Sequence, residues 1–108
     1  EFKEESILNS LEKMNITNIE NIIFAYEPKF NIGSTNIDIE YIKQQLNIIY
    51  DYLKEKYHQK PTIVYGGGIN QNNINEIYHI DTIEGILIGS KSSNIDELNK
   101  LISEINEK

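Results

Sequence analysis

The sequence predicts an α/β fold with parallel strands, and three observations support this prediction. Short apolar runs at residues 22–26, 62–65 and 86–88 have the length of β-strands. The first run is followed by Glu-Pro and the other two by glycine, which end strands. Segments with helical spacing of apolar residues lie before, between and after the runs. Strands that alternate with helical connections form parallel sheets with right-handed crossovers.

Two elements are predicted in the first quarter of the chain. A helix over residues 5–14 carries apolar residues every three or four positions. These are Ile7, Leu8, Leu11 and Met14. The strand at 22–26 is apolar at every position, so we expect it to be buried on both faces.

A long helix is predicted over residues 37–58. Thr35 to Asp38 resembles a capping box at its start. One face of this helix is apolar and is formed by Ile42, Leu46, Ile49 and Leu53.

The second half repeats the alternation with shorter elements. Pro61 introduces the strand at 62–65, and a short helix follows at about 71–79. After the strand at 86–88, Ser93 to Asp96 is a further capping signal for a last helix. Three parallel strands leave two exposed edges, so we expect either a piece that associates with a partner or a part of a longer barrel. The absence of an initiator Met favours the second.

The composition is that of one small globular domain: 108 residues, 39% hydrophobic and 25% charged. The net charge is −7, with ten lysines and no arginine. Basic patches mark nucleic-acid and anionic-membrane surfaces, so we expect neither as a partner. No apolar run approaches the roughly 20 residues of a membrane span. The absence of Cys excludes disulfides, thiolate metal sites and Cys nucleophiles.

The segment after the first strand combines an acid with a loop. Glu27 follows the apolar run directly, at the end of the strand where parallel α/β proteins place catalytic groups. Such an acid suits a general base, and a solvated loop acid is the alternative. The loop from Pro28 to Thr35 suits a lid that excludes water, or else an ordinary connection.

Two glycine-containing segments follow the other strands. Gly66, Gly67 and Gly68 come after the second strand, and Gly89 with Ser90 after the third. Glycine lets the backbone approach a ligand and present N–H groups to a phosphate, although a tight turn also explains it. Because the strands are neighbours in the chain, we expect the two segments to be neighbours in space. The two histidines, His58 and His79, lie at predicted helix ends and not at strand ends.

Together, the string Ala-Tyr-Glu-Pro-x-x-x-Ile-Gly, the triple glycine and the final glycine resemble the triosephosphate isomerase family from about residue 5 onward. The resemblance implies a partial TIM (β/α)8 barrel with three parallel strands and four helices. Residues 1–108 would be the C-terminal part of a single barrel domain, holding strands six to eight. The implied reaction interconverts dihydroxyacetone phosphate and glyceraldehyde 3-phosphate, in glycolysis and gluconeogenesis, without metal or other cofactor.

The resemblance also assigns residues. Glu27 matches the catalytic base. The matches to the phosphate-binding positions are Gly33, Gly67, Gly68, Gly89 and Ser90. The lid is formed by Pro28, Lys29, Phe30, Asn31, Ile32 and Ser34. Tyr65 matches the residue that latches the lid.

Some positions depart from the family pattern. Gly68 stands where the family has a serine, and Ser90 replaces the second glycine of the last pair. Lys29, Asn31 and Thr35 are unusual lid residues. A lost serine hydroxyl that made two hydrogen bonds would weaken lid closure or phosphate affinity roughly tenfold.

The family site also needs a lysine near its first strand and a histidine on its fourth, and this chain supplies neither. We therefore expect the isolated chain to be inactive and the full-length protein to be a cytoplasmic homodimer. Two alternatives stay open: another phosphate-binding (β/α)8 barrel enzyme, and a non-catalytic half-barrel that binds a partner.

Overall fold

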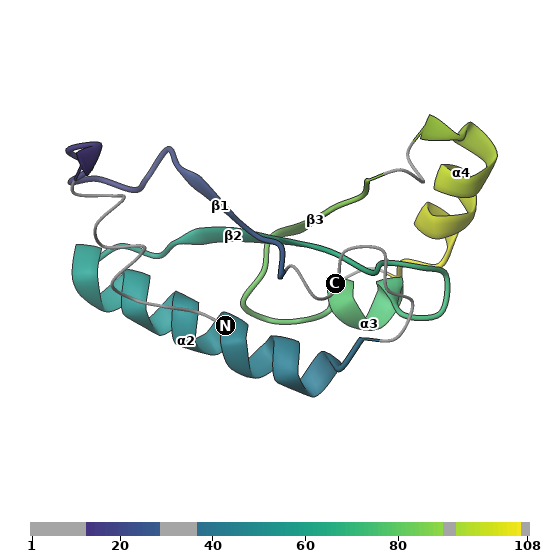
Figure 1. Cartoon of the computed structure of the whole chain (residues 1–108), viewed down its shortest axis with the longest axis horizontal. Helices are drawn as coiled ribbons and strands as arrows, with labels where there is room; N and C mark the ends of the chain where they lie inside the picture. The colour runs from purple at the N-terminus through teal and green to yellow at the C-terminus, as the bar shows by residue number, and fades with distance from the viewer. Residues whose placement is uncertain (1–12, 29–36, 90–92, 107–108) are drawn as a thin grey trace.

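The computed structural model of the chain describes residues 13–28, 37–89 and 93–106. The elements are, in order, β1 (Ile23–Tyr26), α2 (Ile39–Tyr57), β2 (Thr62–Gly66), α3 (Ile74–Tyr78), β3 (Gly85–Leu87) and α4 (Ile95–Ser103). The strands form one sheet in the order β1-β2-β3, and both pairs are parallel (Figure 1). This confirms the predicted α/β class with three parallel strands. The described residues contain three helices, and the predicted helix over residues 5–14 lies almost wholly outside them.

The register of the sheet decides which side chains share a face. Tyr26 pairs with Tyr65, and Tyr65 pairs with Ile86. Side chains of successive residues in a strand point to opposite faces, so these three lie on one face. The residues one position earlier, Ala25 and Val64 among them, lie on the other face.

The helix α2 covers the first of these faces (Figure 1). The carboxylate of Asp38 accepts a hydrogen bond from the Tyr41 N–H at 3.1 Å and caps the helix. The cap is therefore Asp38, whereas the sequence pattern pointed to Thr35, which lies outside the described residues. The predicted apolar face is confirmed, because the buried residues of α2 are Ile42, Leu46, Ile49 and Leu53. They join Ile63 and Tyr65 of β2 in the core.

The opposite face of the sheet is open in the described part of the chain. Ile23 is 67% exposed and Leu87 is 42% exposed. The expectation that residues 22–26 are buried on both faces is therefore wrong. A continuous apolar run indicates that both faces of a strand favour contact with apolar groups. It does not show that the residues covering each face come from the described part of the chain.

The remaining boundaries shift by one to three residues. The strand β3 begins at Gly85 and ends at Leu87, one residue earlier than predicted. The side chain of Asn94, not Ser93, caps α4 by accepting hydrogen bonds from two N–H groups in its first turn. The helix α3 begins only at Ile74. No helix in the described ranges is both long and apolar enough to cross a membrane.

Candidate functional site

The carboxyl ends of the three strands bring the predicted base next to the glycine segment. Glu27 follows β1 directly and Gly66 is the last residue of β2. A Cβ atom built on Gly66 would lie 3.2 Å from Glu27 Cγ and 3.4 Å from Glu27 Oε2. The carboxylate is therefore turned across the strand ends, toward β2. It is exposed to solvent, as a base that must reach a ligand has to be.

Gly66 is glycine for a steric reason. The same Cβ atom would lie 3.2 Å from the Cβ of Leu87 on β3, so it would be crowded from both sides. Such distances are shorter than real side chains accept without a shift of the neighbours. The missing side chain of Gly66 leaves the space that the Glu27 side chain occupies.

The backbone after Gly66 has conformations that favour glycine. Gly67 has φ 124° and Gly68 has φ 66°. Side chains at these values are strained, because their Cβ meets the backbone. We call residues 66–70 the glycine loop. Its predicted position at the end of β2 is confirmed.

Two side chains hold carbonyl groups of the glycine loop. The hydroxyl of Tyr65, which is fully buried, donates to the Gly67 carbonyl at 2.9 Å. The side-chain amide of Asn73 donates to the Gly68 carbonyl at 2.8 Å. The Tyr65 ring also lies 6.1 Å from the Tyr26 ring, centroid to centroid, in the core below the site. Its role as a lid latch concerns residues outside the described ranges and stays a prediction.

Asn70 and Asn73 were not singled out by the sequence patterns. Asn70 Oδ1 accepts hydrogen bonds from the N–H groups of Asn72 and Asn73, at 2.9 and 3.1 Å. Asn73 Oδ1 in turn accepts from the Asn70 N–H at 2.8 Å. Two asparagines three residues apart, directly after a glycine run, are the signal that could have indicated this reciprocal turn.

The segment after the third strand differs from the glycine loop in its packing. Gly89 lies two residues beyond β3, and a Cβ atom built on it meets nothing within 4 Å among the described residues. Local packing in the described part therefore does not require glycine at this position. Ser90 lies outside the described residues. The predicted proximity of this segment to the glycine loop stays a prediction.

Only the first lid residue can be placed. Pro28 is buried directly after Glu27. The other predicted lid residues lie outside the described ranges: Lys29, Phe30, Asn31, Ile32, Gly33 and Ser34.

Both histidines lie at helix ends, as predicted. His58 follows α2 with φ 53°, and His79 follows α3. The Nδ1 of His79 lies 2.7 Å from the Asn75 carbonyl, which can only accept, so Nδ1 carries the proton.

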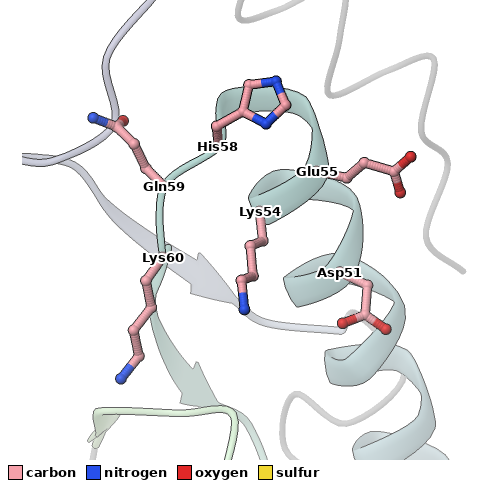
Figure 2. A pocket seen from close by; sticks show the side chains of 6 residues that line it. All are labelled: Asp51, Lys54, Glu55, His58, Gln59 and Lys60. Atoms are coloured by element: carbon pink, nitrogen blue, oxygen red, sulfur yellow. The ribbon is translucent and has the colours of Figure 1, made fainter.

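A hollow lined by charged side chains lies at the other end of the strands, around the end of α2 (Figure 2). It is lined by Asp51, Lys54, Glu55, His58, Gln59 and Lys60. Figure 2 shows these side chains fanning outward rather than converging on one point. Convergent polar groups are expected of a ligand site, so we place the candidate site at the strand ends with Glu27.

Known proteins resemble this chain over most of its length. The family model of triosephosphate isomerase matches residues 1–105. A triosephosphate isomerase of Helicobacter pylori is 33% identical over 100 residues, which cover 93% of this chain and 41% of that protein. The enzyme of Ureaplasma parvum is 37% identical over 98 residues, covering 89% of this chain and 41% of the relative. The enzyme of Buchnera aphidicola is 37% identical over 87 residues, which cover 77% of this chain and 34% of that protein.

The chain thus spans about two fifths of the length of these relatives. The match of the family model over nearly every residue shows that the chain belongs to the triosephosphate isomerase family.

Proposed function

We propose that this chain carries the base and part of the phosphate grip of a triosephosphate isomerase. In the protein at its natural length, Glu27 moves a proton between C1 and C2 of dihydroxyacetone phosphate and glyceraldehyde 3-phosphate. The observation that carries the proposal is the closeness of the Glu27 side chain to Gly66, where an added Cβ would lie 3.2 Å from Glu27 Cγ. This places the proposed base beside the glycine loop. A base and an anion-binding loop at one sheet edge suit a small phosphorylated substrate with an acidic C–H bond.

The chemistry follows from this arrangement. A carboxylate takes the proton from the carbon beside the carbonyl and returns it to the former carbonyl carbon, while the hydroxyl proton passes from one oxygen to the other. The reaction therefore balances without a co-reactant. The phosphate stays bound to backbone amides while the proton moves, which fixes the reacting carbons near Glu27. The proposed donors are Gly33, Gly67, Gly68, Gly89 and Ser90. The base and the closing loop are known properties of the family, carried to this chain by the resemblance.

The lid completes the proposed site. Because Glu27 is exposed in the described structure, water must be excluded before the reactive intermediate forms. We assign this task to the segment from Pro28 to Ser34, with Tyr65 as its latch.

We also propose that residues 1–108 are the C-terminal part of a single TIM-barrel domain, with β1, β2 and β3 as its strands six, seven and eight. The open face of the sheet would then line the barrel interior. The family's lysine and histidine would come from residues outside this chain, which alone is inactive. The complete protein would be a cytoplasmic homodimer acting in glycolysis and gluconeogenesis.

The direct test is Glu27→Gln in the protein at its natural length. The amide keeps the shape of the side chain but cannot take a proton. We expect kcat to fall roughly 10²- to 10⁴-fold while inorganic phosphate still binds. Glu84→Gln is the matched control, because Glu84 is an exposed acid directly before β3, at the amino end of the strands. If both variants turn over triose phosphates equally fast, Glu27 is not the base.

A second candidate function is a non-catalytic module. The open sheet face, with Ile23 67% exposed, favours a chain that covers this face with a partner. Measuring turnover of triose phosphates against other sugar phosphates separates the candidates. A different barrel enzyme would prefer another sugar phosphate, and a binding module would turn over none.

A further inference from the structure

We propose that Asn73 is a positioning residue for the phosphate grip. It holds the glycine loop with its carbonyl groups turned inward, so that the N–H groups of Gly68 and Ile69 face the phosphate of the substrate. The inference rests on the proposed function and adds a residue to it.

The Asn73 side chain is used for the loop and not for the helix. Asn73 is the N-cap of α3, a position where asparagine normally accepts a hydrogen bond from the first turn. It makes no such bond. Its Oδ1 accepts from the Asn70 N–H and its Nδ2 donates to the Gly68 carbonyl, both at 2.8 Å. An N–H and a carbonyl as partners allow only this orientation of the side-chain amide.

The burial of Asn73 makes these two bonds consequential. Among the polar and charged residues of the described part of the chain, Asn73 alone is buried, with 8% of it exposed. A buried amide that loses its partners costs more than the same loss at the surface. The loop and the Asn73 side chain therefore hold each other in one arrangement.

The direction of the loop amides follows from peptide geometry. No described peptide bond is cis, so each carbonyl points opposite to the N–H of the next residue. Tyr65 and Asn73 hold the carbonyls of Gly67 and Gly68. The N–H groups of Gly68 and Ile69 therefore point away from Tyr65 and Asn73.

Among the backbone–backbone hydrogen bonds outside helices and strands in the described ranges, none has either amide as its donor. The positive φ angles at Gly67 and Gly68 allow two successive peptides to adopt this orientation. Successive amides that point outward form an anion-binding concavity.

The Gly68 carbonyl is the weak point of this arrangement. Without the Asn73 donor it is free to turn outward, and a carbonyl oxygen there repels a phosphate. Asn73→Leu removes both bonds of the side chain. Asn73→Asp keeps an acceptor for the Asn70 N–H but removes the donor to the Gly68 carbonyl.

The experiment measures inorganic phosphate binding by ¹H–¹⁵N NMR, together with triose phosphate turnover, in the protein at its natural length. We expect phosphate to shift the Gly68 and Ile69 amide signals, and both Asn73 variants to raise its dissociation constant roughly five- to tenfold. KM should rise in parallel while kcat changes less than about twofold. Asn72→Ala is the control, because Asn72 is an exposed neighbour whose backbone alone takes part in the turn.

The outcomes separate this inference from the proposed function. If the folded variants bind phosphate as tightly as the wild type, Asn73 does not position the loop, and the proposed function stands. If phosphate binding weakens as expected but the wild type isomerises no triose phosphate, the inference stands and the proposed function fails. If phosphate leaves the Gly68 and Ile69 amides of the wild type unshifted, both are overturned. If Asn73→Leu fails to fold, the phosphate dissociation constant of Asn73→Asp tests the inference. The melting temperature of Asn73→Asp then shows that this variant is folded.

Discussion

The two ends of the three strands are built in different ways. At the amino end, side-chain hydrogen bonds join two segments that are distant in sequence. Gln59 Oε1 accepts from the Ile19 N–H at 2.8 Å, and Gln59 Nε2 donates to Asn18 Oδ1 at 3.2 Å. The Glu84 N–H donates to the Ile63 carbonyl at 2.8 Å just before β3. At the carboxyl end, a carboxylate is exposed and two glycines have positive φ angles.

We expect this contrast to separate residues that keep the fold from residues that act on a ligand. In barrels of this type the loops at the carboxyl ends carry the active site, and the opposite end contributes stability. Changes at the carboxyl end should therefore alter turnover more than stability, and changes at the amino end should do the reverse. Three predictions test this contrast, and each compares the protein at its natural length with its variant.

The largest effect is expected for Gly66→Ala. The added Cβ lies 3.2 Å from Glu27 Cγ, so the Glu27 side chain has to move by a few tenths of an ångström. We expect kcat to fall roughly tenfold, less than the roughly 100-fold cost of a misplacement of about 1 Å. Gly85→Ala is the control, since its Cβ would meet Val64 Cγ1 at an ordinary 3.5 Å. Steady-state kinetics of both variants measure the difference. Equal kcat values would show that Glu27 does not use the space beside Gly66 during the reaction.

A smaller effect, on stability, is expected for Gln59→Ala at the amino end. This change leaves the part-buried Ile19 N–H without its acceptor. We expect the free energy of unfolding to fall by about 1–3 kcal/mol, with kcat unchanged. Urea unfolding measures the loss, and Gln71→Ala at an exposed position provides the baseline. A drop in kcat without a drop in stability would contradict the division between the two ends.

The smallest effect is expected for Lys60→Ala. The Lys60 Nζ lies 3.7 Å from Glu84 Oε1, but the two side chains are 70% and 53% exposed. Exposed ion pairs contribute at most about 1 kcal/mol, and salt screens them. Urea unfolding at low and high salt should show a small loss that vanishes at high salt. A loss as large as that of Gln59→Ala would mean that the amino end depends on charge as much as on hydrogen bonds.

The sequence predicted those parts of the fold that depend on local periodicity. The apolar positions of α2 recur as a helix requires, and all four are buried. It did not predict the open face of β1, because an apolar run looks the same whether its cover lies near or far along the chain. It also placed the start of the short helix at residue 71 instead of Ile74. The side chain of Asn70 binds the N–H groups of Asn72 and Asn73 and holds this stretch as a turn.

The candidate site, like the fold, could be predicted from the sequence only in part. Glu27 and the glycine loop follow strands, so their common edge could be expected from topology alone. The closeness of the Glu27 side chain to Gly66 depends on side-chain direction and on the missing Cβ, which no pattern of residue types reveals. The hydrogen bonds of Asn73 were hidden for a further reason. An asparagine before a helix predicts a cap, and here tertiary geometry uses its side chain elsewhere.

The order of the strands has a consequence for how the site comes into being during synthesis. Spatial and sequence order coincide in β1-β2-β3, so each strand adds to the edge left by its predecessor. Among the described strands, Glu27 leaves the ribosome before Gly66, so its neighbour on β2 is made only after α2. A product that ends between α2 and β2 would hold the Glu27 carboxylate without Gly66 beside it.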